Sequence, residues 1–301
     1  MTAAQNPSNR FEAMVSEIEQ IFYWKGTLPA ELADELLTGE DKQGNSILHR
    51  AASNNYLKEL PKLKVCDHQW LRVNHRNESA MLAATINGYI EQVPTRLLTF
   101  DNCVATTNFG QNLLHAAASR ACLSKIPKEV LAKGCLIKSS AAGKTPFMVA
   151  IEMGNLTFRS YPQDMIDHDA VTARTNNGRT ALHQLAELNM LTYLPKNFRT
   201  NEYLSLESEM GITPVHILAE RGQLHTMEHK ELNWEILSKQ TALGTTALAM
   251  LKPEDKEFVL GIEFPAEAQK YFGTEWWKRN QEILDGKKNL TEEHIQTIDI
   301  F

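Results

Sequence analysis

Histidines are the residues in this chain whose type and spacing most strongly suggest a chemical role. His225 and His229 lie four residues apart, so on a helix they would share one face. Glu228 and Glu231 are close to them in the sequence, and imidazole nitrogens and carboxylates are zinc ligands. The spacing does not place either glutamate as a third ligand, so we predict no metal site at this position.

The triplet Gly143-Lys144-Thr145 has the ending of a phosphate-binding loop. That loop reads G-x-x-x-x-G-K-[ST], and the position five before Gly143 is Lys138 rather than glycine. The sequence also lacks the hydrolase motifs G-x-S-x-G and H-E-x-x-H, and its four cysteines show no C-x-x-C spacing. We therefore predict no catalytic residue, no cofactor and no metal, and a protein that is not an enzyme.

The same triplet belongs to a pattern that recurs along the chain. Around Gly211 the pattern has a turn glycine, a helix cap at Thr213, a proline in the first helical turn and a run of apolar residues. Thr213 corresponds to Ser46, Ser79, Asn112, Thr145, Thr180 and Thr246, at successive intervals of 33, 33, 33, 35, 33 and 33 residues. One such unit cannot bury its own apolar face, so we predict a stack of seven repeats between residues 41 and 252.

A proline recurs in the second half of the unit. Pro61, Pro94, Pro127, Pro162 and Pro195 are 33, 33, 35 and 33 residues apart, each preceded by the pattern apolar-x-x-apolar. Proline removes a helical hydrogen bond and disfavours the α conformation in the residue before it. We predict that the second helix of each repeat is broken and restarts with the proline as its first residue.

A period of 33 residues with this pattern resembles the ankyrin repeat, over roughly Leu28 to Lys252. The resemblance implies an all-α repeat solenoid in which the recurring histidine is structural and bonds to backbone of the turn region. That histidine is present in four repeats, as His49, His115, His183 and His216. The repeat at Asn77 departs from the pattern because it lacks the histidine and the turn glycine, and the last repeat has Ala249 in the histidine position.

The segments on either side of the repeats are predicted to cap the stack. Residues 1–40 contain a tail, a helix capped by Ser8 with Phe11, Met14 and Val15 on one face, and a partial repeat. Residues 253–301 contain Trp276, Trp277 and an apolar end, and are predicted to form a C-terminal helical cap or a docking segment.

Composition narrows the partners and the compartment. The net charge is −6 and no basic run occurs, which argues against a nucleic-acid partner. The chain has no cationic start followed by an apolar core and no run of 18 apolar residues, so we predict a cytoplasmic protein with no membrane segment.

The resemblance implies that a protein partner binds the concave face, at positions near the turn glycine and after the inner-helix alanines. These positions carry apolar side chains at Ile86, Phe109, Met153, Leu188, Met210, Ile212 and Leu243. We expect roughly half of them to pack sideways between neighbouring inner helices, and the others to form an exposed stripe that marks a binding surface. Charged positions run from Arg76, Arg120 and Lys144 in early repeats to Glu187 later. Such a gradient would orient a partner with an acidic end and a basic end, whereas a solvated mixed surface is the other interpretation.

The sequence thus predicts a non-enzymatic scaffold, adaptor or inhibitor that holds a protein partner on the concave face. A second hypothesis is an accessory subunit of an enzyme or multiprotein complex, including a phage or pathogen effector that antagonises a host complex. It would dock through its C-terminal segment, with Trp276 and Trp277 as contacts. The identity of the partner and the oligomeric state stay open.

Overall fold

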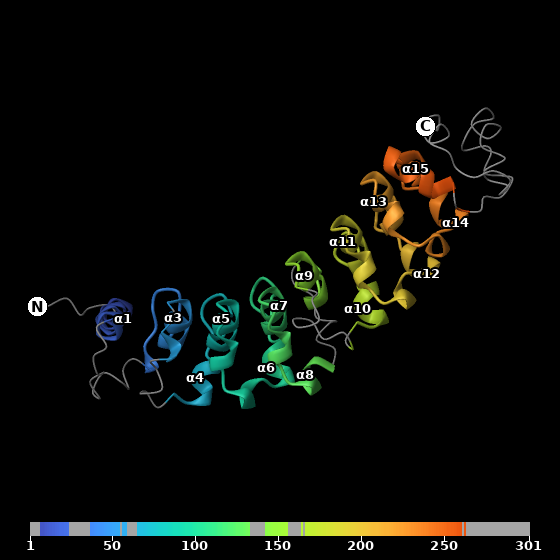
Figure 1. Ribbon diagram of the computed structural model, residues 1–301. Helices are drawn as coiled ribbons and strands as arrows, with labels where there is room; N and C mark the ends of the chain where they lie inside the picture. Colours follow the sequence, from blue (N-terminus) through green and yellow to red (C-terminus); the bar gives the residue numbers. More distant parts are fainter. Residues whose placement is uncertain are drawn as a thin grey trace, which may run out of the picture. The chain divides into compact units, whose positions relative to one another are not determined.

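The computed structural model describes residues 7–23, 37–54, 56–58, 65–132, 142–155, 164, 166–260 and 262, and its regular elements are helices (Figure 1). The chain forms two compact units, Met1–Ile166 and Asp167–Phe301. Their boundary falls within the single 35-residue interval of the repeat. Within the described residues, β-structure is limited to two isolated bridges, Val73–Ser79 and Gln240–Thr246. The all-α repeat fold that the ankyrin resemblance implies is therefore confirmed.

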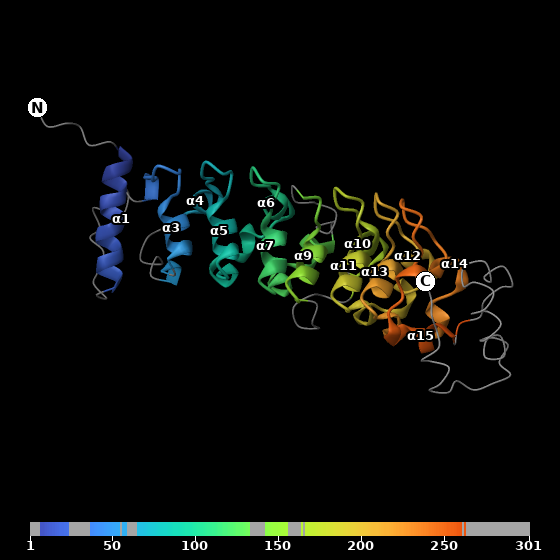
Figure 2. The same cartoon turned by 90° about the horizontal axis from the view of Figure 1, so that it is seen from above.

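The first unit is built from inner helices that pack side by side (Figures 1 and 2). They are the seven-residue helices α3 (Ile47–Ser53), α5 (Ala80–Ile86), α7 (Leu113–Ser119) and α9 (Pro146–Glu152). The outer segments are α4 (Asp67–Leu71), η2 (Ile90–Gln92), η3 (Thr95–Leu97), α6 (Phe100–Val104), η4 (Leu123–Lys125) and α8 (Lys128–Ala132). Helix α1 (Pro7–Tyr23) precedes them and buries Phe11, Met14 and Val15, as predicted, although it begins one residue before Ser8.

The second unit repeats this arrangement. Its inner helices are α11 (Ala181–Glu187) and α13 (Pro214–Glu220). Its other elements are α10 (His168–Thr172), η6 (Leu191–Tyr193), η7 (Lys196–Phe198), α12 (Asn201–Leu204), η8 (Leu224–Thr226), η9 (His229–Glu231), α14 (Trp234–Leu237), η10 (Leu248–Met250) and α15 (Pro253–Leu260).

The seventh repeat differs from its prediction. Its turn is present, but the expected inner helix is reduced to the three residues of η10. Leu251 is already outside the helical region, with ψ 134°, and Pro253 starts α15 two residues later. Proline has no N–H to donate to the preceding helical turn, so it cannot continue a helix, but it is well suited to the first turn of a new one. The prediction of seven full inner helices was therefore wrong at the last repeat.

Each repeat begins with a tight hairpin turn that needs a left-handed residue. Glycine takes this position in most repeats, and where it is missing Asn77 adopts φ 57°, a conformation that asparagine tolerates. A polar residue three positions earlier closes the turn: Asp41 Oδ1 accepts the backbone N–H groups of Gln43 (2.9 Å) and Asn45 (2.8 Å). Asn74, Thr107, Thr175 and Thr241 stand at the same position and accept at least one turn N–H each. This recurring residue is a signal that the sequence analysis missed.

The predicted break in the second helix is confirmed. The 3₁₀ helix η6 ends before Leu194, which is extended at ψ 145°, and η7 starts after Pro195. The proline lies one residue earlier than predicted: Pro127 precedes α8, and its carbonyl accepts the N–H of Val130 at 3.0 Å. Pro61 and Pro162 lie outside the described residues.

The sixth repeat shows that proline does not by itself cause the break. It has Glu228 in the proline position, yet Met227 is extended at ψ 160° and η8 and η9 flank it. Leu224 and Met227 are buried like Leu191 and Leu194 in the preceding repeat. Burial of the two apolar residues of the apolar-x-x-apolar pattern therefore causes the break in the second helix. Proline stabilises this conformation by restricting φ.

Candidate functional site

In four of the described inner helices, α3, α7, α11 and α13, a buried histidine bonds to the backbone of the following repeat. The backbone N–H of Ser46 donates to His49 Nδ1 at 3.2 Å, so the ring proton is on Nε2, which donates to the Glu78 carbonyl at 2.9 Å. His183 bonds in the same way to Thr180 and to the Ile212 carbonyl at 2.9 Å. His216 reaches the Lys239 carbonyl at 3.0 Å. Both ring nitrogens are occupied, which is the structural role that the resemblance implies.

These histidines are held in the neutral form. Burial lowers the pKa of His49, His115 and His216 below the usual value, and the bond to a backbone carbonyl opposes this shift without cancelling it. Burial lowers the pKa of His183 to about 4. An imidazole with this pKa and with no available nitrogen has no role in acid–base chemistry near pH 7.

The third repeat has an imperfect version of this cap. Asn112 Oδ1 accepts the N–H groups of Leu114 and His115, both at 3.1 Å, and lies 2.7 Å from His115 Nδ1. A serine or threonine hydroxyl can donate to Nδ1 while it accepts an N–H, but an amide oxygen only accepts. Asn112 Nδ2 is buried without a hydrogen-bond partner among the described residues.

We therefore expect Asn112→Thr to raise the free energy of unfolding by about 1 to 2 kcal/mol, because it removes a buried unpaired donor and restores the hydroxyl bond. Urea denaturation followed by circular dichroism would measure the change. The matched control is the reverse change, Thr213→Asn, which should destabilise the chain by a similar amount. Equal midpoints for both variants and the wild type would contradict this interpretation of the cap.

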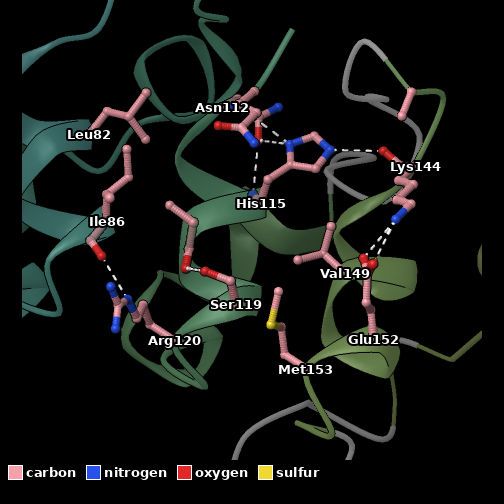
Figure 3. A pocket seen from close by; sticks show the side chains of 13 residues that line it. Leu82, Ile86, Asn112, His115, Ser119, Arg120, Lys144, Val149, Glu152 and Met153 are labelled. Atoms are coloured by element: carbon pink, nitrogen blue, oxygen red, sulfur yellow. Dashed lines mark hydrogen bonds and ion pairs between the residues drawn. The ribbon is translucent and has the colours of Figure 1, made fainter. Parts of the chain in front are cut away.

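The first unit carries a groove of about 550 Å³ between α5, α7 and α9 (Figure 3). We call it the inner groove, and its lining includes Leu82, Ile86, Ser119, Arg120, Val149 and Met153. Met153 is 55% exposed, whereas Ile86 is partly buried. Ile86 and Ser119 are the last residues of α5 and α7, and Arg120 and Met153 directly follow α7 and α9, whereas Leu82 and Val149 lie within α5 and α9.

Charged side chains of the inner groove differ in how they are engaged. Arg120 Nε donates to the Ile86 carbonyl at 2.6 Å, and its Nη groups donate to no described residue. Lys144 Nζ is held by both carboxylate oxygens of Glu152, at 2.9 and 2.8 Å (Figure 3). Arg120 is therefore the cation of the groove that is available to a ligand.

Lys144 forms part of a pairing pattern that the sequence analysis did not anticipate. In the second unit, Arg179 and Glu187 occupy the positions equivalent to Lys144 and Glu152, and they pair at 2.6 Å. Two of the charged residues predicted to bind a partner, Lys144 and Glu187, are thus already paired within their own repeats. The charge gradient along the repeats is weaker than a simple count of charges indicates.

The other predicted contact residues lie at the surface. Phe109 is 64% exposed at a turn tip of the first unit. In the second unit Leu188, Met210, Ile212 and Leu243 are exposed. Among the predicted apolar residues only Ile86 is partly buried, so sideways packing is less frequent than expected. Arg76 is exposed as well, and Trp276 and Trp277 lie outside the described residues.

His225 and His229, the last two histidines of the repeats, contact residues of α15. His225 Nδ1 lies 2.8 Å from Asp255 Oδ1, and His229 stacks on Phe258 with ring centroids 4.3 Å apart. Both side chains therefore hold α15 against the sixth repeat. No group of three or more metal-ligating side chains occurs among the described residues. Nor does any helix there combine the length and apolar character needed to cross a bilayer.

The similarity of this chain to known proteins is found among solved structures. No family model and no curated protein matches the chain. Among solved structures, the chain is similar to the ankyrin repeat domain of Bcl-3, which is described as a unique member of the IkappaB protein family. The sequence identity is 15% and the TM-score 0.45, over 71% of this chain and 94% of that chain. The 33-residue period and the bonds between repeats, both internal to this chain, carry the ankyrin-like description of the fold.

Proposed function

We propose that this chain is a non-enzymatic protein-binding scaffold that takes a segment of a partner protein into the inner groove of the first unit. The observation that carries the proposal is the exposed apolar side chain of Met153 in a groove that also presents Arg120. Exposure of an apolar side chain to water is unfavourable, so covering it with a partner contributes favourable free energy to binding.

The exposed apolar side chains in and beside the inner groove favour a protein segment over a buried small molecule. Its lining includes the apolar side chains of Leu82, Val149 and Met153, and Phe109 adds an exposed aromatic ring at the tip of the turn that leads into α7. Protein interfaces typically combine such apolar anchors with an arginine, and a few of these residues carry most of the affinity.

The charge of the groove favours an acidic residue in the bound segment. Lys144 and Glu152 neutralise each other, so Arg120 gives the groove its net positive charge. A carboxylate on the partner could form a charge-assisted hydrogen bond with the Nη groups of Arg120. We infer a partner segment that has a carboxylate near Arg120 and an apolar side chain against Met153.

An affinity capture with matched variants tests this function. We expect wild-type chain to capture one protein from an extract of its native cells, and Met153→Glu and Arg120→Glu to lose it. Calorimetry with the purified partner should then show at least about tenfold weaker binding for each variant, since truncated interface anchors commonly have effects of this size.

The control places the same substitution elsewhere on the first unit. Leu71 is 37% exposed at the end of α4, outside the inner groove, so Leu71→Glu should bind like the wild type. Circular dichroism would confirm that all variants fold. Equal binding by the groove variants and the control would show that the partner uses another surface, and would reject the proposed site.

A further inference from the structure

Neighbouring hairpin turns are joined by a ladder of backbone hydrogen bonds. In four of the described turns, the residue before the left-handed position accepts an N–H from the following turn. In the first unit, His75 donates to the Gln43 carbonyl at 2.9 Å and Asn108 to the Arg76 carbonyl at 3.0 Å. In the second unit, Glu209 donates to the Asn177 carbonyl at 3.2 Å and Ala242 to the Met210 carbonyl at 2.9 Å. Each of these four turns therefore presents a carbonyl acceptor that an N–H of the next turn occupies.

The next turn also covers the glycine itself. A Cβ added to Gly178 would lie 2.8 Å from the backbone nitrogen of Glu209. One added to Gly211 would lie 3.0 Å from the backbone nitrogen of Ala242. Backbone thus packs directly on backbone at these tips, which is a contact that glycine permits.

The last turn of the second unit breaks this pattern. A Cβ added to Gly244 would meet no atom of the described chain within 4 Å, and no described residue donates to the Leu243 carbonyl. Leu243 is 83% exposed, more than Met210 at 53% in the preceding turn. Within the part of the chain that the structure describes, no following turn therefore pairs with the last turn of the ladder.

Helix α15 packs against the sixth repeat, at the end opposite to the turns. A Cβ on Gly222, after α13, would lie 3.1 Å from the Lys252 side chain, and His225 and His229 bind Asp255 and Phe258. Figure 2 shows α15 on the side of the repeat away from the turns. Within the described residues, α15 therefore covers the end of α13 and does not contact the turn at Gly244.

We propose that the open turn at residues 241–245 is a second docking surface, which takes an extended or turn-forming segment of a partner polypeptide. The segment donates a backbone N–H to the Leu243 carbonyl, packs its backbone on Gly244 and covers the side chain of Leu243. The proposed contact is the same as the one that a following turn makes with the turn before it inside the chain. It belongs to the class of recognition in which a partner extends a hydrogen-bonded edge. It excludes proline at the donor position.

A cyclic peptide that carries residues 239–246 of this chain is the natural probe, because that turn already docks on Met210 and Gly211. We expect it to cause saturable amide shifts confined to residues 241–245 in the NMR spectrum of the full chain. Methylation of the peptide nitrogen that corresponds to Ala242 should weaken binding about five- to tenfold, since it removes one hydrogen bond.

Variants of the chain locate the contact. Leu243→Asp should abolish the shifts, whereas Tyr193→Asp, at a residue 60% exposed elsewhere in the same unit, should leave them unchanged. The groove variant Met153→Glu should also bind the peptide normally, so failure of this surface and failure of the proposed function are distinguishable. Absence of shifts at residues 241–245, as would occur if residues 263–301 cover the turn, or equal binding of the methylated peptide, would overturn the proposal.

Discussion

Lowering the pH from 7 to 5 should destabilise the fold, and His183 should dominate the loss in the second unit. Its pKa is about 4 in the folded chain, against an ordinary value of 6.5. The unfolded chain therefore takes up a proton as the pH falls through 6.5, while the folded chain stays unprotonated until about pH 4. The stabilisation is complete above 6.5, and roughly 3 kcal/mol from this residue is lost by pH 4.

Urea denaturation at several pH values between 7.5 and 5 would measure how the free energy of unfolding changes with pH. Hydrogen exchange of the α11 and α13 amides would assign this change to the second unit. The control is His183→Gln, which should be less stable at pH 7.5 but should show a shallower dependence on pH. His49, His115 and His216 shift in the same direction, so some slope should remain. A free energy of unfolding that is constant between pH 7 and 5 would contradict the assigned neutral state.

Removal of one partner of the buried Arg199–Glu231 pair should have an effect of similar size. Their side chains are 7% and 5% exposed, and Arg199 Nη1 lies 3.3 Å from Glu231 Oε1. Glu231 Oε2 also accepts the N–H of Glu228 at 3.0 Å. We expect Glu231→Ala to cost about 3 to 5 kcal/mol, because it leaves a buried guanidinium and a backbone N–H without their partner.

The double variant Arg199→Met with Glu231→Leu separates the charge from the packing. We expect it to recover most of the lost stability, since apolar side chains of similar volume replace buried ion pairs at little cost. The surface pair Lys196–Glu228 is the control, and Lys196→Ala should change the urea midpoint only slightly. A Glu231→Ala variant as stable as Lys196→Ala would show that the buried pair contributes nothing.

The local parts of the fold were predictable because each is encoded within one repeat. Turn glycines, the Ser/Thr cap and the proline break depend on neighbours in the sequence, and their period made them visible. The seventh inner helix failed as a prediction since Pro253 overrides the repeat pattern at that point. Asp41 and its equivalents were visible in principle, as polar residues three positions before the turn glycine.

The candidate site was less predictable because it depends on pairing between side chains. Exposure of Phe109 and Met153 followed from their place in the repeat, but the Lys144–Glu152 pair that neutralises the groove did not. The Arg199–Glu231 pair joins residues 32 apart, close to one period. A search for opposite charges separated by about one repeat would have found both this pair and Lys196–Glu228.

The bonds from histidine to the following repeat also affect the order in which the chain can fold during synthesis. His49 finds its acceptor in the Glu78 carbonyl and His115 in the Lys144 carbonyl, each 29 residues later. On the ribosome, an inner helix emerges well before the turn that completes its bonding. Folding of the growing chain therefore trails synthesis by about one repeat. A fragment cut directly after α3 or α7 contains a histidine whose Nε2 donor has lost its carbonyl partner.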